Sequence, residues 1–462
     1  MGLDEGSLSW RPGHLASEGP RYLALVAALE RDIADGRLSE GDRLPPHRNL
    51  ARELSLSVGT VSKAYQEAEH RGIINSRVGQ GTFVRRRLIE QPQFVTKYEP
   101  VNLSLNVPVE GSEVRILSRL FAEVTRENEL RPLLRFHPHG GIMKHREIIA
   151  ASLSNSNFTI EPAHLFLCNG AQHALDIALR LVTEPGDSVL VGSFTYSGFK
   201  AIAAASRLRL IPVEMDAEGL DPESLRQVFH QSRARVLYCM PTLQSPTART
   251  MSLTRRKQIA EVAEELDLTV IEDDVYGFFF SERPVPIASL APTRTFYTTS
   301  YSKCITPGFR LGTLTVPRPY IHEADLLLHA SAWYASPIFS EAVVRLLRDG
   351  NLEDLLRERR KQAQERYSVF FNTFSNAEKL KCPAFYGWLR LPTEWAAGQF
   401  TAAAGSRGIL VTPPGASAVR ESEPGAVRIC LGAPKDTKTL TQVLHTLNDI
   451  LSSRPIDVDS VA

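Results

Sequence analysis

The chain has 462 residues, 43% of them hydrophobic and 23% charged, with a formal net charge of +1 at pH 7. This length predicts two or three globular domains, and the near-neutral charge excludes binding of a polyanion by bulk charge alone. The five cysteines form no Cys-x-x-Cys pair, and no apolar run has the length of a membrane span. We therefore expect a cytoplasmic protein without a disulfide framework, a zinc site or contact with a membrane.

A basic domain is expected over residues 21–87, which carry twelve Lys and Arg against eight Asp and Glu. The remainder of the chain then has a small negative charge, so only this domain is expected to meet nucleic acid. Segment 1–20 before it is rich in Gly, Pro and Ser, and we expect it to be disordered.

Three helices and a hairpin are predicted in this domain. Apolar residues at helical spacing indicate a first helix that Gly36 ends, and a second, short helix starts after a turn with two prolines. Ser57 can cap a third helix over Val58 to His70. Two strand-like pieces, Ile73–Ser76 and Thr82–Val84, flank a hairpin tip. Three helices followed by a hairpin are the plan of a winged helix-turn-helix domain.

The third helix begins with small polar residues, as a helix that enters the major groove of DNA does. Its side chains can donate to phosphates or base edges, and two glycines let the hairpin tip approach the DNA backbone. The candidate DNA-binding residues are Arg48, Ser57, Thr60, Ser62, Lys63, Gly79 and Gly81. The helical spacing alone leaves an alternative open, namely a small helical bundle with a solvated charged face.

The complete set of motifs resembles the GntR family of bacterial repressors. The resemblance lies in Gly41-Asp-Arg-Leu-Pro-Pro-His-Arg48, Leu50-Ala51, Val58-Gly-Thr-Val-Ser-Lys-Ala-Tyr65 and Gly79-Gln-Gly-Thr-Phe-Val84. The family usually has Ser where His47 stands and often an Arg near Gly59. Both departures touch DNA-facing positions, so they affect the operator sequence rather than DNA binding itself.

Residues 88–100 contain two prolines without clear periodicity, which predicts a short linker. In residues 101–450, strand-length apolar runs then alternate with amphipathic helices, which predicts an α/β domain with a parallel sheet covered by helices. The expected strands are His164–Cys168, Ser188–Val191, Val236–Met240, Thr269–Glu272 and Thr295–Thr298. The mixed helix and strand signals after about residue 325 predict a smaller α+β lobe, followed by a tail over 451–462.

Side chains suited to pyridoxal phosphate (PLP) follow the ends of the expected strands. PLP chemistry needs a lysine for the aldehyde, an acid for the ring nitrogen, a phosphate cradle, an aromatic ring and an arginine for the ligand carboxylate. The candidates are Gly170, Ala171, Gln172, Tyr196, Asp273, Tyr276, Ser300, Lys303, Arg310 and Arg428. Each signal is weak alone, because a strand-end Asp is more often a helix cap and a single Lys is usually solvated. The ordered set is more specific.

The set resembles the fold-type-I aminotransferases over nearly all of residues 101–450. Joined to a GntR-like domain, it looks like the MocR subfamily of bacterial regulators. The resemblance implies that Lys303 forms a Schiff base with PLP, Asp273 pairs with its ring nitrogen and Tyr276 hydrogen-bonds its ring oxygen. It implies that Tyr196 stacks on the ring and that Arg428 binds a ligand carboxylate. The implied phosphate-holding residues are Gly170, Ala171, Gln172, Ser300 and Arg310.

Two departures from the family pattern affect this site. Ser245, in Ser245-Pro-Thr-Ala248, is a further candidate cofactor-binding residue, and it stands where the family has the Asn of Asn-Pro-Thr-Gly that contacts the ring oxygen. The tyrosine expected shortly before Gly140, which would reach the phosphate in the partner subunit, is missing. Arg135 or Phe136 stands there instead, and Arg135 can replace it electrostatically.

Three nearby histidines, His137, His139 and His145, raise the question of a metal site. They share no regular element, and no carboxylate or cysteine joins them at a familiar ligand spacing. A loop that lines the cofactor pocket near a dimer interface is therefore favoured.

The favoured function is a PLP-dependent, ligand-responsive transcription regulator that senses an amine, an amino acid or PLP itself. The alternatives are an active aminotransferase with a secondary DNA-binding domain, and a PLP-binding body with a degenerate one. The short linker and Ser245 favour sensing over turnover. We expect a homodimer, because fold-type-I sites usually form at a two-fold interface and paired half-sites on DNA match that symmetry.

Overall fold

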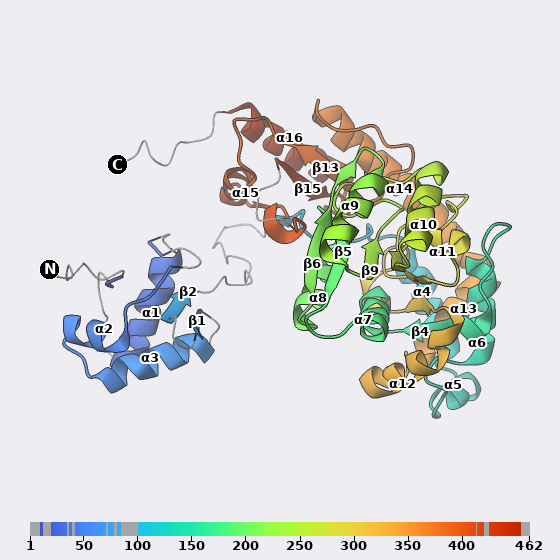
Figure 1. The fold of residues 1–462 in the computed structure, drawn as a ribbon. Helices are drawn as coiled ribbons and strands as arrows, with labels where there is room; N and C mark the ends of the chain where they lie inside the picture. The colour runs from blue at the N-terminus through green and yellow to red at the C-terminus, as the bar shows by residue number, and fades with distance from the viewer. Residues whose placement is uncertain are drawn as a thin grey trace. The chain divides into compact units, whose positions relative to one another are not determined.

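The computed structural model describes residues 10–12, 20–34, 37–38, 42–70, 73–77, 81–84, 100–412, 414–419 and 425–453. The chain divides into two compact units, Met1–Val95 and Thr96–Ala462, which are described separately (Figure 1). Most of the expected N-terminal segment 1–20, linker 88–100 and tail 451–462 lies outside the described residues, as does Gly79. The boundaries expected for these segments stay predictions.

The N-terminal unit is a winged helix-turn-helix domain, as the sequence predicted. Its elements are α1 (Arg21–Ala34), α2 (His47–Glu53), α3 (Val58–His70), β1 (Ile74–Arg77) and β2 (Gly81–Val84). The two strands pair antiparallel, and apolar side chains of the three helices and the hairpin share one core. The backbone N–H of Thr60 donates to Ser57 Oγ at 3.0 Å, which confirms Ser57 as the cap of α3.

Residues 42–44 add an unpredicted edge to this hairpin. The N–H of Leu44 donates to the Thr82 carbonyl at 2.8 Å, and the N–H of Val84 donates to the Asp42 carbonyl at 2.9 Å. This segment was expected to be only a turn. The pairing ties the hairpin to the entrance of α2.

The C-terminal unit is built on a seven-stranded mixed sheet with the order β4-β12-β11-β10-β9-β5-β6. The strands are β4 (Leu165–Cys168), β5 (Ser188–Gly192), β6 (Arg209–Val213), β9 (Val236–Cys239), β10 (Thr269–Asp273), β11 (Thr295–Ser300) and β12 (Gly312–Thr315). The expected parallel sheet is wrong in one respect, because it also contains the unpredicted strand β12, which pairs antiparallel with both β11 and β4. The segment between β11 and β12 holds no crossover helix, which a parallel connection would need.

Helices cover both faces of this sheet (Figure 1). Alternate strand residues point to opposite sides, so Val189 and Ile271 pack in one apolar core while Leu190 and Val270 pack in another. The surrounding helices are α4 (Glu113–Val124), α5 (Glu127–Leu133), α6 (Met143–Leu153), α7 (Ala171–Val182), α8 (Ser197–Ala205), α9 (Pro222–Ser232), α10 (Leu253–Glu265), α11 (Ile287–Leu290), α12 (Ile321–Ala332) and α13 (Pro337–Arg348). This gives the three-layer α/β architecture of the fold-type-I aminotransferases.

A smaller α+β lobe follows, as expected. It holds α14 (Asn351–Thr373), β13 (Tyr386–Arg390), α15 (Ala397–Ser406), β14 (Ile409–Leu410), β15 (Ala426–Cys430) and α16 (Thr437–Ser452). Strand β3 (Val101–Asn102), from the start of the unit, pairs with β14 and so joins this lobe. The remaining short elements are β7 (Met215–Asp216), β8 (Gly219–Leu220), η1 (Pro162–His164), η2 (Gly277–Phe279), η3 (Pro307–Phe309), η4 (Arg318–Tyr320) and η5 (Pro414–Ala416).

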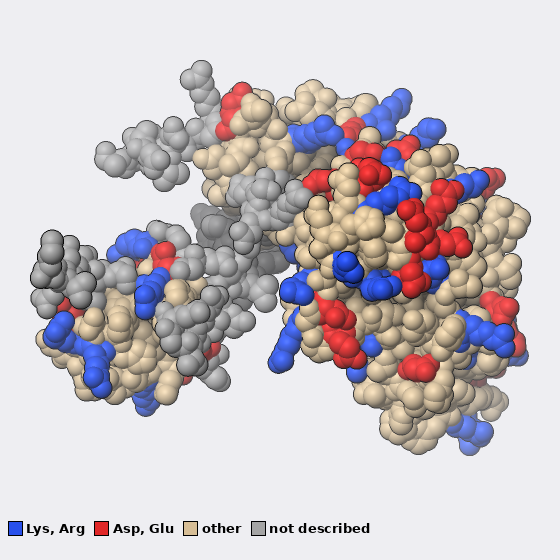
Figure 2. Space-filling view, viewed as in Figure 1, with Lys and Arg blue, Asp and Glu red and all other residues tan. Residues whose placement is uncertain are grey.

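Within the described part of the chain, none of the helices combines the length and apolar character needed to cross a membrane. Figure 2 shows Lys and Arg side chains mixed with Asp and Glu over the visible face of the C-terminal unit. That face therefore presents no continuous basic surface for a polyanion.

Candidate cofactor and DNA-binding sites

Lys303 lies in the loop that follows β11 and is partly buried. Its Nζ donates a hydrogen bond to the backbone carbonyl of Asn106 at 2.8 Å. Burial, followed by the nearby charge of Arg428, lowers the pKa of Lys303 to about 8. A lysine with this pKa holds a larger fraction of neutral, nucleophilic amine near neutral pH than a solvated lysine does.

Asp273 is the last residue of β10 and is 1% exposed. Its carboxylate accepts from the Tyr238 hydroxyl at 2.9 Å and from the N–H of Val275 at 3.4 Å. Burial nevertheless raises the pKa of Asp273 to about 7. Among the described residues no ion pair joins this carboxyl, so a cation brought beside it would be favoured strongly.

Tyr276 is held by a residue that the sequence did not single out. Asn106 Nδ2 donates to the Tyr276 hydroxyl at 2.6 Å, while the carbonyl of the same residue accepts from Lys303. Asn106 lies between β3 and α4, far from both partners in the chain. No motif marks it, because its contacts form only when the start of the unit returns to the sheet.

Arg428 on β15 is 8% exposed and contacts Ser245. Its Nη1 donates to Ser245 Oγ at 3.1 Å, and its Nη2 donates to the Ser104 carbonyl at 3.0 Å. The Nε of Arg428 is buried and has no hydrogen-bond partner among the described residues. Ser245 therefore helps to orient the arginine while one N–H of the guanidinium stays available to a ligand.

The start of α7 forms a cradle against Arg310. Gly170 precedes the helix with φ of 84°, and a Cβ at this position would lie 2.7 Å from Arg310 Nη2. A Cβ at Gly312 would likewise lie 2.7 Å from the backbone nitrogen of Ala171. Helix N-terminal N–H groups beside an arginine suit a phosphate. Ser300 Oγ is already engaged, because it donates to the Leu311 carbonyl at 3.1 Å.

Tyr196 is partly buried just before α8 and lies in the same region. Burial raises its pKa, and the charges of Asp273, Arg428 and Arg310 also act on that pKa. Two other aromatic residues of this region, Phe199 and Tyr238, stack on each other, with ring centroids 3.6 Å apart and an interplanar angle of 8°. Of the remaining expected cradle residues, Gln172 is exposed.

The structure thus gathers in one region a lysine, a buried acid that has no ion-pair partner among the described residues, an oriented arginine and a glycine-lined cradle. These features fit PLP. The cradle at Gly170 would be filled by any side chain, Asp273 suits a ring-nitrogen cation, and the Nε of Arg428 suits a carboxylate. The carboxyl ends of the parallel strands lie at the same end of the sheet, so residues that follow different strands meet there.

In the N-terminal unit, the expected DNA-binding residues differ in the exposure and the hydrogen bonding of their side chains. Arg48 on α2 is exposed, and Ser57 and Thr60 share a hydrogen bond of 2.8 Å between their hydroxyls. Ser62 is partly buried and pairs with His47 Nδ1 at 2.9 Å. His47 therefore has a packing role beside any effect on the operator sequence.

Three further residues of this unit are Lys63, Gly81 and Val58. Lys63 Nζ lies 4.3 Å from the centre of the Tyr22 ring, which orients its exposed side chain. Gly81 has φ of 116°, and a Cβ there would lie 2.9 Å from Arg43 Nε. Val58, which the sequence reasoning missed, is 45% exposed at the first turn of α3. Such an apolar group can contact a thymine methyl.

The histidines of the 137–145 segment have separate partners. His145 is 4% exposed and bonds to Ser340 Oγ at 2.8 Å and to Glu341 Oε2 at 2.9 Å. His139 stacks on His329, with ring centroids 4.4 Å apart. Across the residues that the structure describes, there is no cluster of three or more metal-ligating side chains.

A winged helix-turn-helix domain fused to a fold-type-I aminotransferase domain is the domain order of GntR regulators of the MocR type. The model of aminotransferase class I and II matches residues 98–447, and that of bacterial regulatory proteins of the gntR family matches residues 21–84. The chain belongs to the class I and II aminotransferase family, which typically uses PLP, and carries a GntR-type head.

Two relatives and one solved structure match large parts of this chain. The uncharacterized HTH-type transcriptional regulator YdeF of Bacillus subtilis is 29% identical over 96% of this chain and 97% of its own. The probable rhizopine catabolism regulatory protein MocR of Rhizobium meliloti is 25% identical over 76% of each chain. LysN, an α-aminoadipate aminotransferase of Thermus thermophilus, matches 77% of this chain and 92% of its own with a TM-score of 0.69 and 21% identity, which shows the fold.

Proposed function

We propose that this chain is a PLP-dependent, ligand-responsive transcription regulator that acts on DNA in the cytoplasm. The main supporting observation is that Lys303, Asp273 and Arg428 lie in one region of the C-terminal unit. The same chain also contains an N-terminal domain of the GntR type. The names of the HTH-type relatives support regulation, and the LysN structure, solved with N-(5'-phosphopyridoxyl)-L-leucine, supports the cofactor.

When bound, PLP supplies an aldehyde that bonds to an amine and a ring that withdraws electrons. Asp273 would hold the ring nitrogen with its charge, and Tyr276 would donate to the ring oxygen from the position that Asn106 fixes. Gly170, Ala171 and Arg310 would hold the phosphate. Lys303 would carry the cofactor, and burial keeps its amine ready for that bond.

The effector would be an amine or amino acid, or PLP itself. The Nε of Arg428 is a free donor in a buried position, and its Nη groups are held by Ser245 and Ser104. An oriented guanidinium binds a carboxylate with little loss of side-chain entropy. These contacts favour an amino acid over an amine that lacks a carboxylate.

We further propose a homodimer. Phe136 is 80% exposed and Trp333 48% exposed, and their rings contact each other with centroids 5.5 Å apart. Leu134, two residues before Phe136 in the chain, is 68% exposed. An apolar patch of this kind is typical of an interaction surface, and exposed Arg135 would then lie at the interface. Two-fold symmetry would match paired half-sites on the operator.

The second candidate function is aminotransferase activity, which is supported by the presence of Lys303, Asp273 and Arg428 in one region. A lysine with a pKa of about 8 can take up and release protons near neutral pH, as turnover requires. Steady turnover of a physiological amino acid at ordinary enzyme rates would support this function.

DNA binding with and without ligands tests the proposal. Fluorescence anisotropy on the full chain would compare its own upstream DNA with random DNA over a salt series. We expect a preference for the upstream DNA that PLP with amino acids changes and that Lys303→Ala makes insensitive to them. A ligand can produce this change only by binding two arrangements with different affinity. Equal affinity for both DNAs at every salt concentration overturns the regulator.

A further inference from the structure

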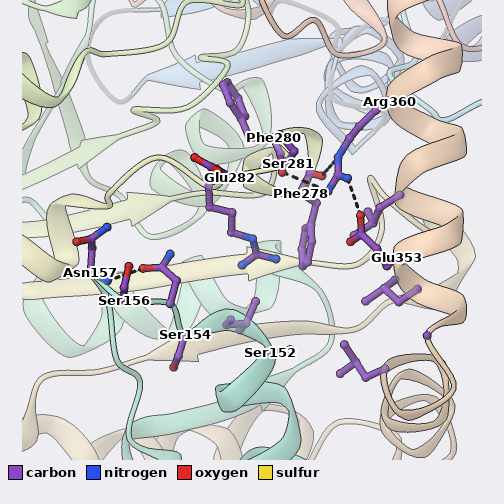
Figure 3. Close-up of a pocket in the computed structure, with 17 residues that line it drawn as sticks. Ser152, Ser154, Ser156, Asn157, Phe278, Phe280, Ser281, Glu282, Glu353 and Arg360 are labelled. Carbon is purple, nitrogen blue, oxygen red and sulfur yellow. Dashed lines mark hydrogen bonds and ion pairs between the residues drawn. The ribbon is translucent and has the colours of Figure 1, made fainter.

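A cavity of about 630 Å³ lies apart from the proposed cofactor site, and its lining includes neither Lys303, Asp273 nor Arg428. Figure 3 shows the main segments that line it: the residues that follow α6, with Ser154 and Asn157, the segment after β10, with Phe278 and Glu282, and the start of α14. Leu347 of α13 also lines the cavity. Its volume falls within the range of small-molecule pockets. Its walls carry mostly polar groups, which favours a polar ligand.

Arg283 in this cavity has an unused hydrogen-bond donor. Its guanidinium lies 4.0 Å from the centre of the Phe278 ring, and its Nη1 is buried without a hydrogen-bond partner in the described part of the chain. Leaving a charged, buried N–H unpaired is unfavourable, and an anion would relieve this. The stacking on Phe278 fixes the guanidinium plane, so less entropy is lost when a ligand binds.

Arg360, the other arginine that lines the cavity, has a structural role. Arg360 donates to the carbonyls of Phe278 and Phe280, both at 3.2 Å, and pairs with Glu353 at 2.8 Å (Figure 3). These bonds tie α14 to the segment after β10. Arg360 therefore stabilises the wall of the cavity through its hydrogen bonds. Arg283, in contrast, is oriented by Phe278 and keeps one donor, Nη1, without a hydrogen-bond partner among the described residues.

The remaining groups limit the charge of the ligand. Glu353 is paired with Arg360, and Glu282 is exposed at the rim. A highly charged anion would meet repulsion from these carboxylates, while hydroxyl groups could donate to them. Ser156 and Asn157 are exposed on the opposite wall and can bond to hydroxyls as well.

We propose that this cavity is a second binding site, for a small hydroxylated organic anion whose carboxylate or phosphate group binds Arg283. The site is independent of the proposed function at Lys303. It is connected to that region by packing, because Phe278 contacts Tyr301, two residues before Lys303, with ring centroids 5.3 Å apart.

Isothermal titration of the full chain with glycerate, glycerol 3-phosphate and neutral glycerol tests the site. The titrations use the double variant Arg310→Gln with Arg428→Gln as the background, because the cradle at α7 would otherwise bind phosphate and Arg428 would otherwise bind a carboxylate. We expect one of the two anions to bind and glycerol not to bind, which also decides between a carboxylate and a phosphate ligand. Adding Arg283→Gln should weaken binding at least tenfold, the effect of losing one charged hydrogen bond.

Arg357→Gln is the matched control, since Arg357 is a 71% exposed arginine on α14, and it should leave binding unchanged. Ser156→Trp at the exposed wall should block the cavity without disturbing the fold, so it decides the question even if Arg283→Gln fails to fold. The absence of binding by both anions overturns the proposal. So does binding that persists in Ser156→Trp, or in a folded Arg283→Gln variant. Each of these results leaves the Lys303 proposal untouched.

Discussion

Lys303 Nζ donates to the carbonyl of Asn106, a residue 197 positions earlier in the chain, at 2.8 Å. The side-chain amide of Asn106 donates in turn to the Tyr276 hydroxyl. One residue from the start of the unit therefore positions two groups at the ends of different strands. The carbonyl also keeps the amine in the interior, where burial lowers its pKa.

Lys303→Ala should abolish covalent retention of PLP, because the variant lacks the amine that we propose to bond to the aldehyde. The chain is incubated with PLP, passed through gel filtration and measured by its visible absorbance. In the wild type, the rate of PLP uptake should rise with pH through about 8, as Lys303 loses its proton. Lys257→Ala, an exposed lysine on α10, is the control and should retain PLP. Equal retention by Lys303→Ala would contradict the assignment.

Asp273→Asn should stabilise the cofactor-free chain most at high pH. The pKa of Asp273 is raised to about 7 in the folded chain. The neutral carboxyl therefore contributes its whole stabilisation of the fold at pH values below the pKa that Asp273 has in the unfolded chain. This contribution is lost as the pH rises through 7. The melting temperature of the variant should therefore exceed that of the wild type by a margin that grows by about 2 °C or more from pH 5 to pH 8. A difference in melting temperature that stays constant from pH 5 to pH 8 would contradict the raised pKa of Asp273. Asp267→Asn, with a 78% exposed side chain, should show no such trend.

Arg428→Gln should weaken binding of amino acids while PLP is retained. The loss of a charged hydrogen bond to the carboxylate corresponds to about tenfold to hundredfold in affinity. Spectral titration of the PLP-loaded chain with an amino acid and with an amine that lacks the carboxylate measures this. Only the amino acid should be affected. Arg390→Gln, a 59% exposed arginine on the neighbouring strand β13, should behave as wild type, and an equal loss for both ligands would refute the role.

Arg48→Ala should weaken DNA binding about equally for all sequences. A phosphate contact carries no sequence information, so the slope of log affinity against log salt should fall by about 1. Anisotropy titrations over a salt series check this. Arg235→Ala removes the same charge from a 69% exposed position in the body and should leave the slope unchanged. A change in sequence preference without a change in slope would instead indicate a base contact.

Trp333→Glu combined with Phe136→Glu should convert the proposed dimer into a monomer, because each introduces a charge into the apolar patch. Sedimentation velocity at several concentrations measures the mass in solution. Phe371→Glu, at a 36% exposed phenylalanine on α14, is the control. A monomeric wild type, or a double variant of unchanged mass, removes this face as the dimer interface.

The sequence by itself determined the local elements and the chemical groups. Helix α3 and its cap at Ser57 follow from contiguous residues, and Asp273 and Lys303 stand where strand patterns end. Helical periodicity, capping and strand termination depend on neighbours in the chain, so a single sequence carries these signals.

Only the tertiary structure decided which distant groups meet. The direction of β12, the place of Asn106 and the bond between Arg428 and Ser245 depend on packing between segments far apart in the chain. The donor left unused on Arg283 is likewise visible only after folding, because an unpaired group is defined by what surrounds it. Such relations have no period or spacing in the sequence, which is why sequence reasoning did not find them.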